Sequence, residues 1–224
     1  MPEVNGRLLS RGYSYLAVAL VGYIFVLVPL GSDLPQGGLL VQTVFSIILA
    51  TAVYVCANRR WELYISLALF APAFFLSWLG QAGLSQELGL LQLASGAAFL
   101  LYTASVVLGS TLRSKVISTD TISGAVAVYL LIAVAWSLIY GIILILDPTA
   151  IELPGVTASV GDVRATESLM YFSFVTITTL GFGDILPLSA VARSAATFEA
   201  VVGQIYLTVL VARFVGLQIA QSND

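Results

Sequence analysis

The chain lacks most of the residues that metal, acid–base and disulfide chemistry require. Its 224 residues include no histidine, which excludes a histidine metal site and a histidine-based catalytic pair. The single cysteine, Cys56, excludes an intramolecular disulfide framework. Charged residues form only 9% of the chain, against about 25% in an ordinary soluble domain. The net charge of −3 gives no indication of a nucleic-acid partner. No set of catalytic side chains gathers within the apolar segments, so we do not expect an enzyme.

Apolar residues dominate instead. They make up 59% of the chain, and the mean hydropathy is +0.99, which predicts an integral membrane protein. Six segments approach the roughly 20 helical residues needed to cross a bilayer core about 30 Å thick. They run over residues 13–30, 39–57, 61–79, 89–108, 125–146 and 190–218. The first run is longer than a signal-peptide core, and GSDLPQGG after it offers no clear cleavage site, so we expect this span to be retained.

Basic residues fall in alternate connections between these spans. They are Arg7, Arg11, Arg59, Arg60, Arg113, Lys115 and, closing the sixth span, Arg213. The other connections carry Asp33, Glu87, Asp147, Glu152, Asp162 and Glu167, with Arg164 as their one basic residue. Because Lys and Arg accumulate in cytoplasmic loops, we predict that the N- and C-termini are both cytoplasmic.

The connection between the fifth and sixth spans contains a short apolar run. After the loop DPTAIELPGVTASVGDVRAT comes ESLMYFSFVTIT, about 12 residues, which is too short to cross a bilayer. Its two ends must return to the same side, because the flanking spans are antiparallel neighbours. We therefore predict a re-entrant half-helix, capped by Thr166 with Glu167 near its positive N-terminal end.

The run TTLGFGD follows this half-helix and must leave the membrane as extended backbone. Backbone of this kind is tolerated at membrane depth only where it is buried in protein or lines a water-filled path. Gly181 and Gly183 permit positive φ, so that successive carbonyls can face one side. Together with the Thr179 hydroxyl, the carbonyls of Thr179, Leu180, Gly181 and Phe182 could replace the hydration shell of a cation.

These residues resemble the potassium-channel pore, whose signature T-x-x-T-x-G-[YF]-G-D is filled by Thr176, Thr179, Gly181, Phe182, Gly183 and Asp184. The resemblance covers about residues 125–216. It implies an all-α membrane protein with six transmembrane helices, a re-entrant pore helix and a filter loop, assembled as a homotetramer in the plasma membrane, here a bacterial inner membrane. It also implies potassium binding at Thr179, Leu180, Gly181, Phe182 and Gly183, with support from Thr176, Thr178 and Asp184. Potassium is the permeant ion, lipid is the surrounding partner, and no cofactor is implied.

The sequence departs from the family pattern at three places. Phe182 replaces the commoner tyrosine and removes a hydroxyl from the filter wall, and Leu180 replaces valine. Val175 occupies the place of a glutamate that partners the final aspartate in some relatives, so Asp184 needs another partner or water. A weakly selective Na⁺/K⁺ channel is the alternative function. A transporter is a more distant one, because only one interrupted segment is present where paired broken helices are typical.

The resemblance implies that the last span lines the inner pore. The candidates for its cavity and gate are Gly203, Gln204, Leu207 and Val211. Gly203 is equally compatible with a hinge and with a small-residue packing contact, whereas Gln204 is expected to face the cavity. Glu199, a polar group in the same span, is expected to be protonated and bonded behind the filter, or to pair with another protomer.

Residues 1–110 resemble a four-helix voltage-sensor domain but lack its arginines. A sensor needs several charges within the membrane, each worth about 2.3 kcal/mol per 100 mV. The fourth span, GLLQLASGAAFLLYTASVVLG, has none, and its run of small residues suits close packing. We therefore predict a four-helix membrane domain without the arginines of a voltage sensor in its fourth span (1–110), a cytoplasmic linker (111–124), a pore domain (125–218) and a short cytoplasmic tail (219–224). Gating is then expected in the filter, around Gly203, or through lipid and tension acting on the outer spans.

Overall fold

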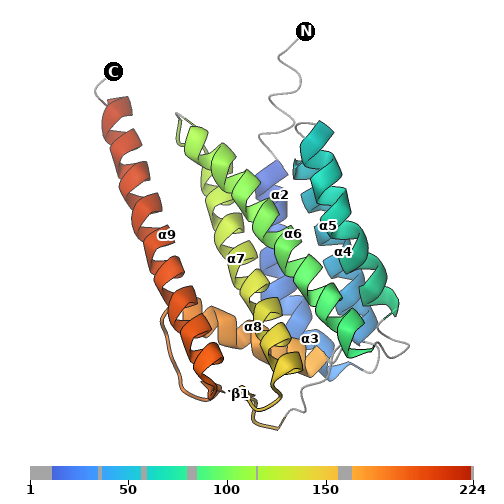
Figure 1. Ribbon diagram of the computed structural model, residues 1–224. Coiled ribbons are helices and arrows are strands. Elements are labelled where there is room, and N and C mark those ends of the chain that lie inside the picture. Colours follow the sequence, from blue (N-terminus) through green and yellow to red (C-terminus); the bar gives the residue numbers. More distant parts are fainter. Residues whose placement is uncertain are drawn as a thin grey trace.

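The computed structural model describes residues 12–34, 37–56, 60–79, 85–114, 116–155 and 163–222, and these form almost entirely helix (Figure 1). The elements are α2 (Gly12–Gly22), the π-helix η1 (Tyr23–Leu27), α3 (Val28–Asp33), α4 (Gly37–Cys56), α5 (Arg60–Leu79), α6 (Gln86–Arg113), α7 (Thr119–Leu146), β1 (Ile151–Glu152), α8 (Val163–Ile177), β2 (Leu186–Pro187) and α9 (Ala190–Ser222). The long helices run side by side, and α8 lies across one end of the bundle. Parts of the span and orientation arguments depend on residues that lie outside the described ones. These residues are Arg7, Arg11, Ala57, Arg59, Lys115 and Asp162.

Five described helices are long and apolar enough to cross a membrane. They are Tyr13–Gly31, Trp61–Leu79, Gln86–Arg113, Thr119–Leu146 and Ala190–Gln221. The second expected span lies in α4, whose apolar part, Gly37–Val53, is shorter than the others. The prediction of an all-α fold with several helices that could span a membrane is therefore confirmed, and the count of six crossings stays a prediction.

The first helical span changes its winding partway along. Residues Tyr23–Leu27 form a π-helix between α2 and α3, directly before Pro29 in the first turn of α3. Proline cannot donate a backbone hydrogen bond, and its ring crowds the carbonyl four residues earlier, which in a continuous helix is that of Phe25. A local widening to π geometry relieves this conflict without ending the helix.

The expected linker and tail are shorter in the structure. Helix α6 continues to Arg113 and α7 begins at Thr119, so residues 111–113 and 119–124 are helical rather than linker. The start of α7 is fixed by Ser118, whose hydroxyl accepts a hydrogen bond from the Thr121 amide at 3.1 Å. Helix α9 likewise runs on to Ser222 through most of the expected tail.

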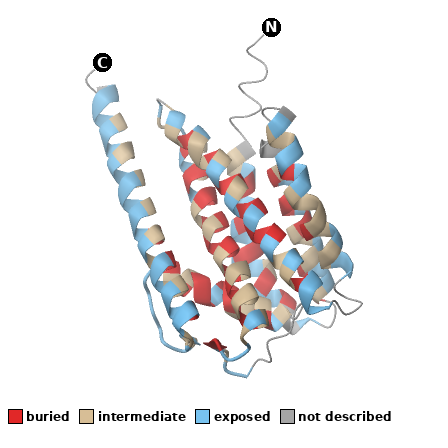
Figure 2. Cartoon of the chain, in the orientation of Figure 1, coloured by how far each residue is buried: buried red, intermediate tan, exposed pale blue. Residues whose placement is uncertain are grey.

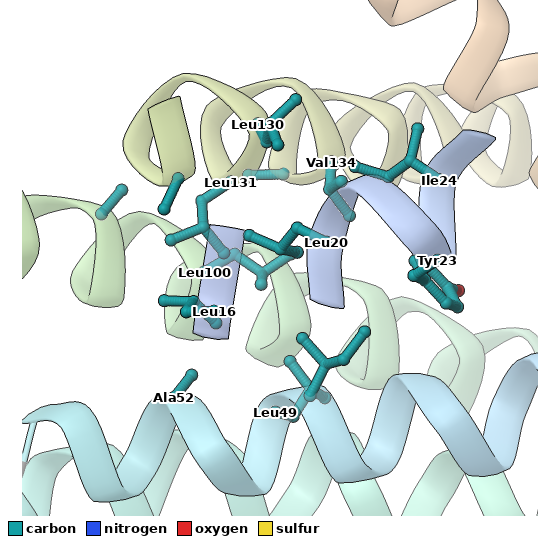
Figure 3. Close-up of a cluster of buried hydrophobic side chains, with 14 of the residues drawn as sticks. Leu16, Leu20, Tyr23, Ile24, Leu49, Ala52, Leu100, Leu130, Leu131 and Val134 are labelled. Carbon is teal, nitrogen blue, oxygen red and sulfur yellow. The ribbon is translucent and has the colours of Figure 1, made fainter. Parts of the chain in front are cut away.

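A large apolar core joins the N-terminal helices to α7 (Figure 3). It contains Leu16 and Leu20 of α2, Leu49 and Ala52 of α4, Leu100 of α6, and Leu131 and Val134 of α7, each at most 2% exposed. A Cβ added at Gly96 of α6 would lie 3.1 Å from the Leu138 side chain of α7. Ser95, Gly96 and Ala97 of the fourth span are buried, whereas Ala94 and Ala98 are exposed, so the structure supports a packing surface in the middle of this run of small residues.

A second, smaller cluster forms around Tyr140 of α7. It includes Ile151 of β1, Phe172 of α8 and Ala192 of α9. The Tyr140 and Phe172 rings meet edge to face with centroids 4.8 Å apart. Because this cluster joins α7, α8 and α9, it fixes the position of the segment that follows α8.

Helix α9 is largely uncovered in the single chain (Figure 2). Only 6% of its apolar window is buried, and Val201, Ile205, Val209 and Val215 are all more than 45% exposed. A continuous apolar surface of this length indicates contact with lipid or with further protein.

Candidate functional site

Helix α8 is a short element whose flanking segments meet. Its 15 residues span about 22 Å at roughly 1.5 Å per residue, less than a bilayer core of about 30 Å. Strand β1 before it pairs antiparallel with β2 after it, through Ile151 with Pro187 and Glu152 with Leu186. The chain therefore enters and leaves this region at one edge. The predicted cap at Thr166 is wrong, because the helix begins three residues earlier at Val163 and places Thr166 and Glu167 within its first turns.

The C-terminal end of α8 passes directly into the TTLGFGD run. Thr179 has φ of +60°, and its amide donates to the Thr176 carbonyl at 2.9 Å, while the Leu180 amide donates to the Val175 carbonyl at 2.9 Å. This pair of hydrogen bonds around a left-handed residue is a Schellman motif, in which glycine is the usual left-handed residue. Thr176 thus contacts the TTLGFGD run through its backbone carbonyl. The hydrogen bonds at the end of α8 fix the backbone conformation of the first residues of this run.

Left-handed residues alternate with ordinary ones along this run. Thr179, Gly181 and Gly183 have φ of +60°, +60° and +79°, and Leu180 and Phe182 between them do not. The conformation expected of the two glycines is confirmed, and that of Thr179 was not anticipated because it is not a glycine. A left-handed residue with a side chain costs roughly 1–2 kcal/mol. Residues 178–184 are all exposed in the single chain, and a Cβ at either glycine would meet nothing within 4 Å.

Asp184, at the end of the run, has a partner that the sequence did not indicate. The Tyr171 hydroxyl donates to its Oδ2 at 2.7 Å, and the Ile185 amide donates to its Oδ1 at 3.1 Å. The Tyr171 hydrogen bond lowers the pKa of the Asp184 carboxyl below its usual range. Tyr171 also lies parallel to the Phe182 ring, at a centroid distance of 6.4 Å and an interplanar angle of 10°. Tyr171 lies one helical turn before Val175, so the two side chains share a face of α8. This spacing could have indicated Tyr171 as the partner of Asp184 from the sequence alone.

Glu199 is fully buried, between α7 and α8. The Tyr140 hydroxyl donates to its Oε2 at 2.5 Å, and its Oε1 lies 2.5 Å from the Ser173 hydroxyl oxygen. Of the two expectations for Glu199, hydrogen bonding within its own chain is the one that the structure favours, since both partners belong to the same chain.

Gly203 is a close-packing position. A Cβ there would lie 2.5 Å from the Ile177 carbonyl oxygen at the end of α8, and 2.6 Å from the Ile177 Cγ1. The structure therefore supports the packing interpretation of this glycine. Gln204, Leu207 and Val211 are exposed on α9 in the single chain.

Arg213, near the far end of α9, reaches the end of α6. Its Nη2 donates to the carbonyls of Leu112 and Ser114. The last carbonyls of a helix have no partner within the helix and carry its negative dipole end, so a guanidinium is well placed there. This contact links the C-terminal end of α6 to the part of α9 that is far along the helix from the TTLGFGD run.

One of three comparisons with known proteins finds a similarity, and it lies in the C-terminal part of the chain. A family model described as an ion channel matches residues 121–218, which contain α7, β1, α8, the TTLGFGD run, β2 and most of α9. A search of curated proteins and a search of solved structures each found no match. Residues 121–218 are thus similar to an ion channel domain, and the chain has five described helices that are long and apolar enough to cross a membrane.

Proposed function

We propose that the chain is a potassium-selective channel and that residues 179–183 form its filter. The observation that carries this is the alternation of left-handed and ordinary backbone at Thr179, Gly181 and Gly183. Such an alternation turns successive carbonyl oxygens to one side, where with the Thr179 hydroxyl they replace the hydration shell of K⁺. Thr178 and Asp184 support the filter from its two ends. Potassium is the permeant ligand, and no cofactor is needed.

The proposed assembly is a homotetramer around the filter. One strand of carbonyls cannot surround an ion, whereas four strands can. The exposure of residues 178–184 and the uncovered face of α9 leave the required surfaces open in the single chain. Three further copies and lipid are the partners that fit them.

The proposed orientation places the filter end outside the cell and both termini in the cytoplasm, in a plasma membrane. Glu152 and Asp184 lie at the filter end. Arg213 lies against the connection from α6 to α7 at the other end, near Arg113. Basic residues at the cytoplasmic end agree with the positive-inside rule.

A weakly selective Na⁺/K⁺ channel is the alternative, favoured by the loss of the filter hydroxyl at Phe182. The stacking of Tyr171 on Phe182 and its hydrogen bond to Asp184 provide another support for the filter wall. This support favours selectivity for K⁺. The described basic residue of α6 is Arg113 in its last turn, so we propose that the N-terminal helices do not act as an arginine-based voltage sensor.

The test uses the full-length protein, purified and reconstituted in liposomes and planar bilayers. We expect reversal potentials in mixed K⁺ and Na⁺ to follow K⁺, and conductance without steep voltage activation. Gly181→Ala should abolish K⁺ flux, because alanine is strained at φ of +60°. Gly109→Ala, at a helical glycine of α6 with nothing within 4 Å, is the matched control and should conduct. Robust K⁺-selective flux through Gly181→Ala would contradict the filter assignment.

A further inference from the structure

We infer that Glu199 is a neutral carboxylic acid that positions helix α8, and with it the filter, between α7 and α9. Only the expected effect on ion flux rests on the proposed function. The protonation state and the structural role rest on the contacts of the single chain.

Three side chains and one carbonyl form a closed group behind α8. Tyr140 of α7, Ser173 of α8 and Glu199 of α9 are each 0% exposed. The Tyr140 hydroxyl and Glu199 Oε2 are 2.5 Å apart, and the Ser173 hydroxyl oxygen and Glu199 Oε1 are also 2.5 Å apart. The Ser173 hydroxyl oxygen lies in addition 2.7 Å from the Ala133 carbonyl oxygen of α7. All three distances are those of hydrogen bonds between oxygen atoms.

The number of hydrogen atoms decides the state of the carboxyl group. Each of the three contacts needs one hydrogen, and a carbonyl oxygen can only accept. Tyr140 and Ser173 carry one hydroxyl hydrogen each, so an ionised Glu199 leaves one contact without a hydrogen. A protonated Glu199 supplies the third. Tyr140 then donates to Glu199, Glu199 donates to Ser173, and Ser173 donates to the Ala133 carbonyl.

The surroundings agree with this count. Among the residues that the structure describes, the hydrogen-bond partners of the Glu199 carboxyl are two hydroxyl groups, and neither is basic. An unpaired charge in a buried site is costly, whereas a neutral acid with every hydrogen bond made is not. The group is therefore self-contained in its neutral form.

The location of the group explains why it positions the filter. Ser173 stands two residues before Val175, whose carbonyl accepts the Leu180 amide where the filter begins. On the other side of α8, Tyr171 holds Asp184 where the filter ends. Because α8 is hydrogen-bonded to both ends of the filter, a displacement of α8 moves both ends. Glu199 is the side chain through which α9 restrains that shift.

Infrared spectroscopy tests the protonation state in the full-length protein. The difference spectrum between wild type and Glu199→Gln at neutral pH should contain the carbonyl band of a protonated carboxylic acid, with a deuterium shift. Glu152→Gln, which removes an exposed carboxyl group in β1, is the matched control and should leave that band in place. A Glu199 difference spectrum with only carboxylate bands overturns the proposal. This readout does not require the protein to conduct.

Variants test the positioning role. Glutamine can accept from Tyr140 and donate to Ser173 as the neutral acid does, so Glu199→Gln should keep near wild-type K⁺ flux and melting midpoint. Glu199→Leu leaves the buried Tyr140 hydroxyl without a partner and should lower flux by about tenfold or more. Should the leucine variant fail to assemble, Tyr140→Phe, which removes one of the three bonds, should lower the midpoint. The positioning role is refuted by a leucine or phenylalanine variant that matches wild type, or by a glutamine variant as defective as leucine. Absence of flux in wild type would refute the proposed function alone, since the infrared and melting results still decide this inference.

Discussion

Replacing Gly203 with alanine separates two roles for this glycine, a packing contact and a hinge. In the structure the added Cβ lies 2.5 Å from the Ile177 carbonyl oxygen, about 0.9 Å short of the 3.4 Å at which ordinary contact begins. The same methyl group lies 2.6 Å from the Ile177 Cγ1. A backbone carbonyl at the end of α8 cannot rotate away as a flexible side chain can. Helix α9 must therefore move away from α8.

The size of the effect follows from the overlap. Overpacking of a well-packed contact costs about 1–3 kcal/mol in each chain. For a chain of this length, each kcal/mol corresponds to a change of about 2–4 °C in the melting midpoint. We therefore expect Gly203→Ala to melt several degrees below wild type. Because Ile177 directly precedes the filter segment, we also expect reduced K⁺ flux.

Gly216→Ala is the matched control. It lies in the same helix, and nothing stands within 4 Å of its added Cβ. Alanine favours a helix over glycine by about 0.8–1.0 kcal/mol, so this variant should melt at or slightly above the wild-type midpoint. The assay is thermal unfolding of the detergent-purified protein, with flux measured in liposomes. If Gly203→Ala behaves like Gly216→Ala in melting and alters only channel opening, the packing argument is refuted and the hinge interpretation stands.

Three further substitutions test other contacts. Tyr171→Phe removes the hydrogen-bond donor that lowers the pKa of the Asp184 carboxyl. A lowered pKa means that the ionised carboxylate stabilises the folded state above the usual aspartate range. This stabilisation is lost as the pH falls through the lowered pKa. External acidification should therefore reduce conductance at a higher pH in the variant, and identical pH profiles would contradict this. Arg213→Ala removes the hydrogen bonds to the end of α6 and should raise the open probability in single-channel recordings. Arg193→Ala removes two local hydrogen bonds to the Leu188 carbonyl and should leave the open probability unchanged. Equal effects of the two substitutions would exclude a role for the link to α6. Leu186→Tyr places aromatic rings at the outer mouth, where a quaternary ammonium gains about 0.5–2 kcal/mol over an aromatic face. We expect external tetraethylammonium to block the wild type weakly and this variant at least tenfold more strongly. Unchanged sensitivity in a conducting variant would show that Leu186 does not face the entrance.

The long helices were predictable because their signal is local and repeated. An apolar run of about 20 residues has few alternatives to a membrane helix, and the expected spans at 61–79 and 125–146 fall within α5 and α7. Their ends were less predictable. The fourth expected span ends at residue 108, but α6 continues through polar residues to Arg113. The fifth expected span begins at residue 125, but α7 begins at Thr119 after the Ser118 cap. In both cases backbone hydrogen bonds extend the helix past the apolar stretch.

The support around the filter segment could not be predicted from the sequence, because it depends on residues far apart in the chain. Tyr140 and Glu199 are 59 positions apart, and Ser173 and Ala133 are 40 apart. Each polar residue has several possible partners, and tertiary packing selects one. The close approach at Gly203 is of the same kind, since a glycine in a span is equally compatible with a bend and with a contact until its neighbour is known.

The conformation of Thr179 shows how the end of α8 and the glycines act together. Gly181 and Gly183 can adopt positive φ without strain, but by themselves they do not determine which residues of the run are left-handed. Thr179 is left-handed at a cost of roughly 1–2 kcal/mol, and the two hydrogen bonds that close on Val175 and Thr176 offset part of it. These bonds start the alternation at residue 179, and the glycines at 181 and 183 continue it in the same phase. A shift of α8 alters this starting point, so the contacts of Ser173, Glu199 and Gly203 with neighbouring helices bear on the filter even though none of them lies in it.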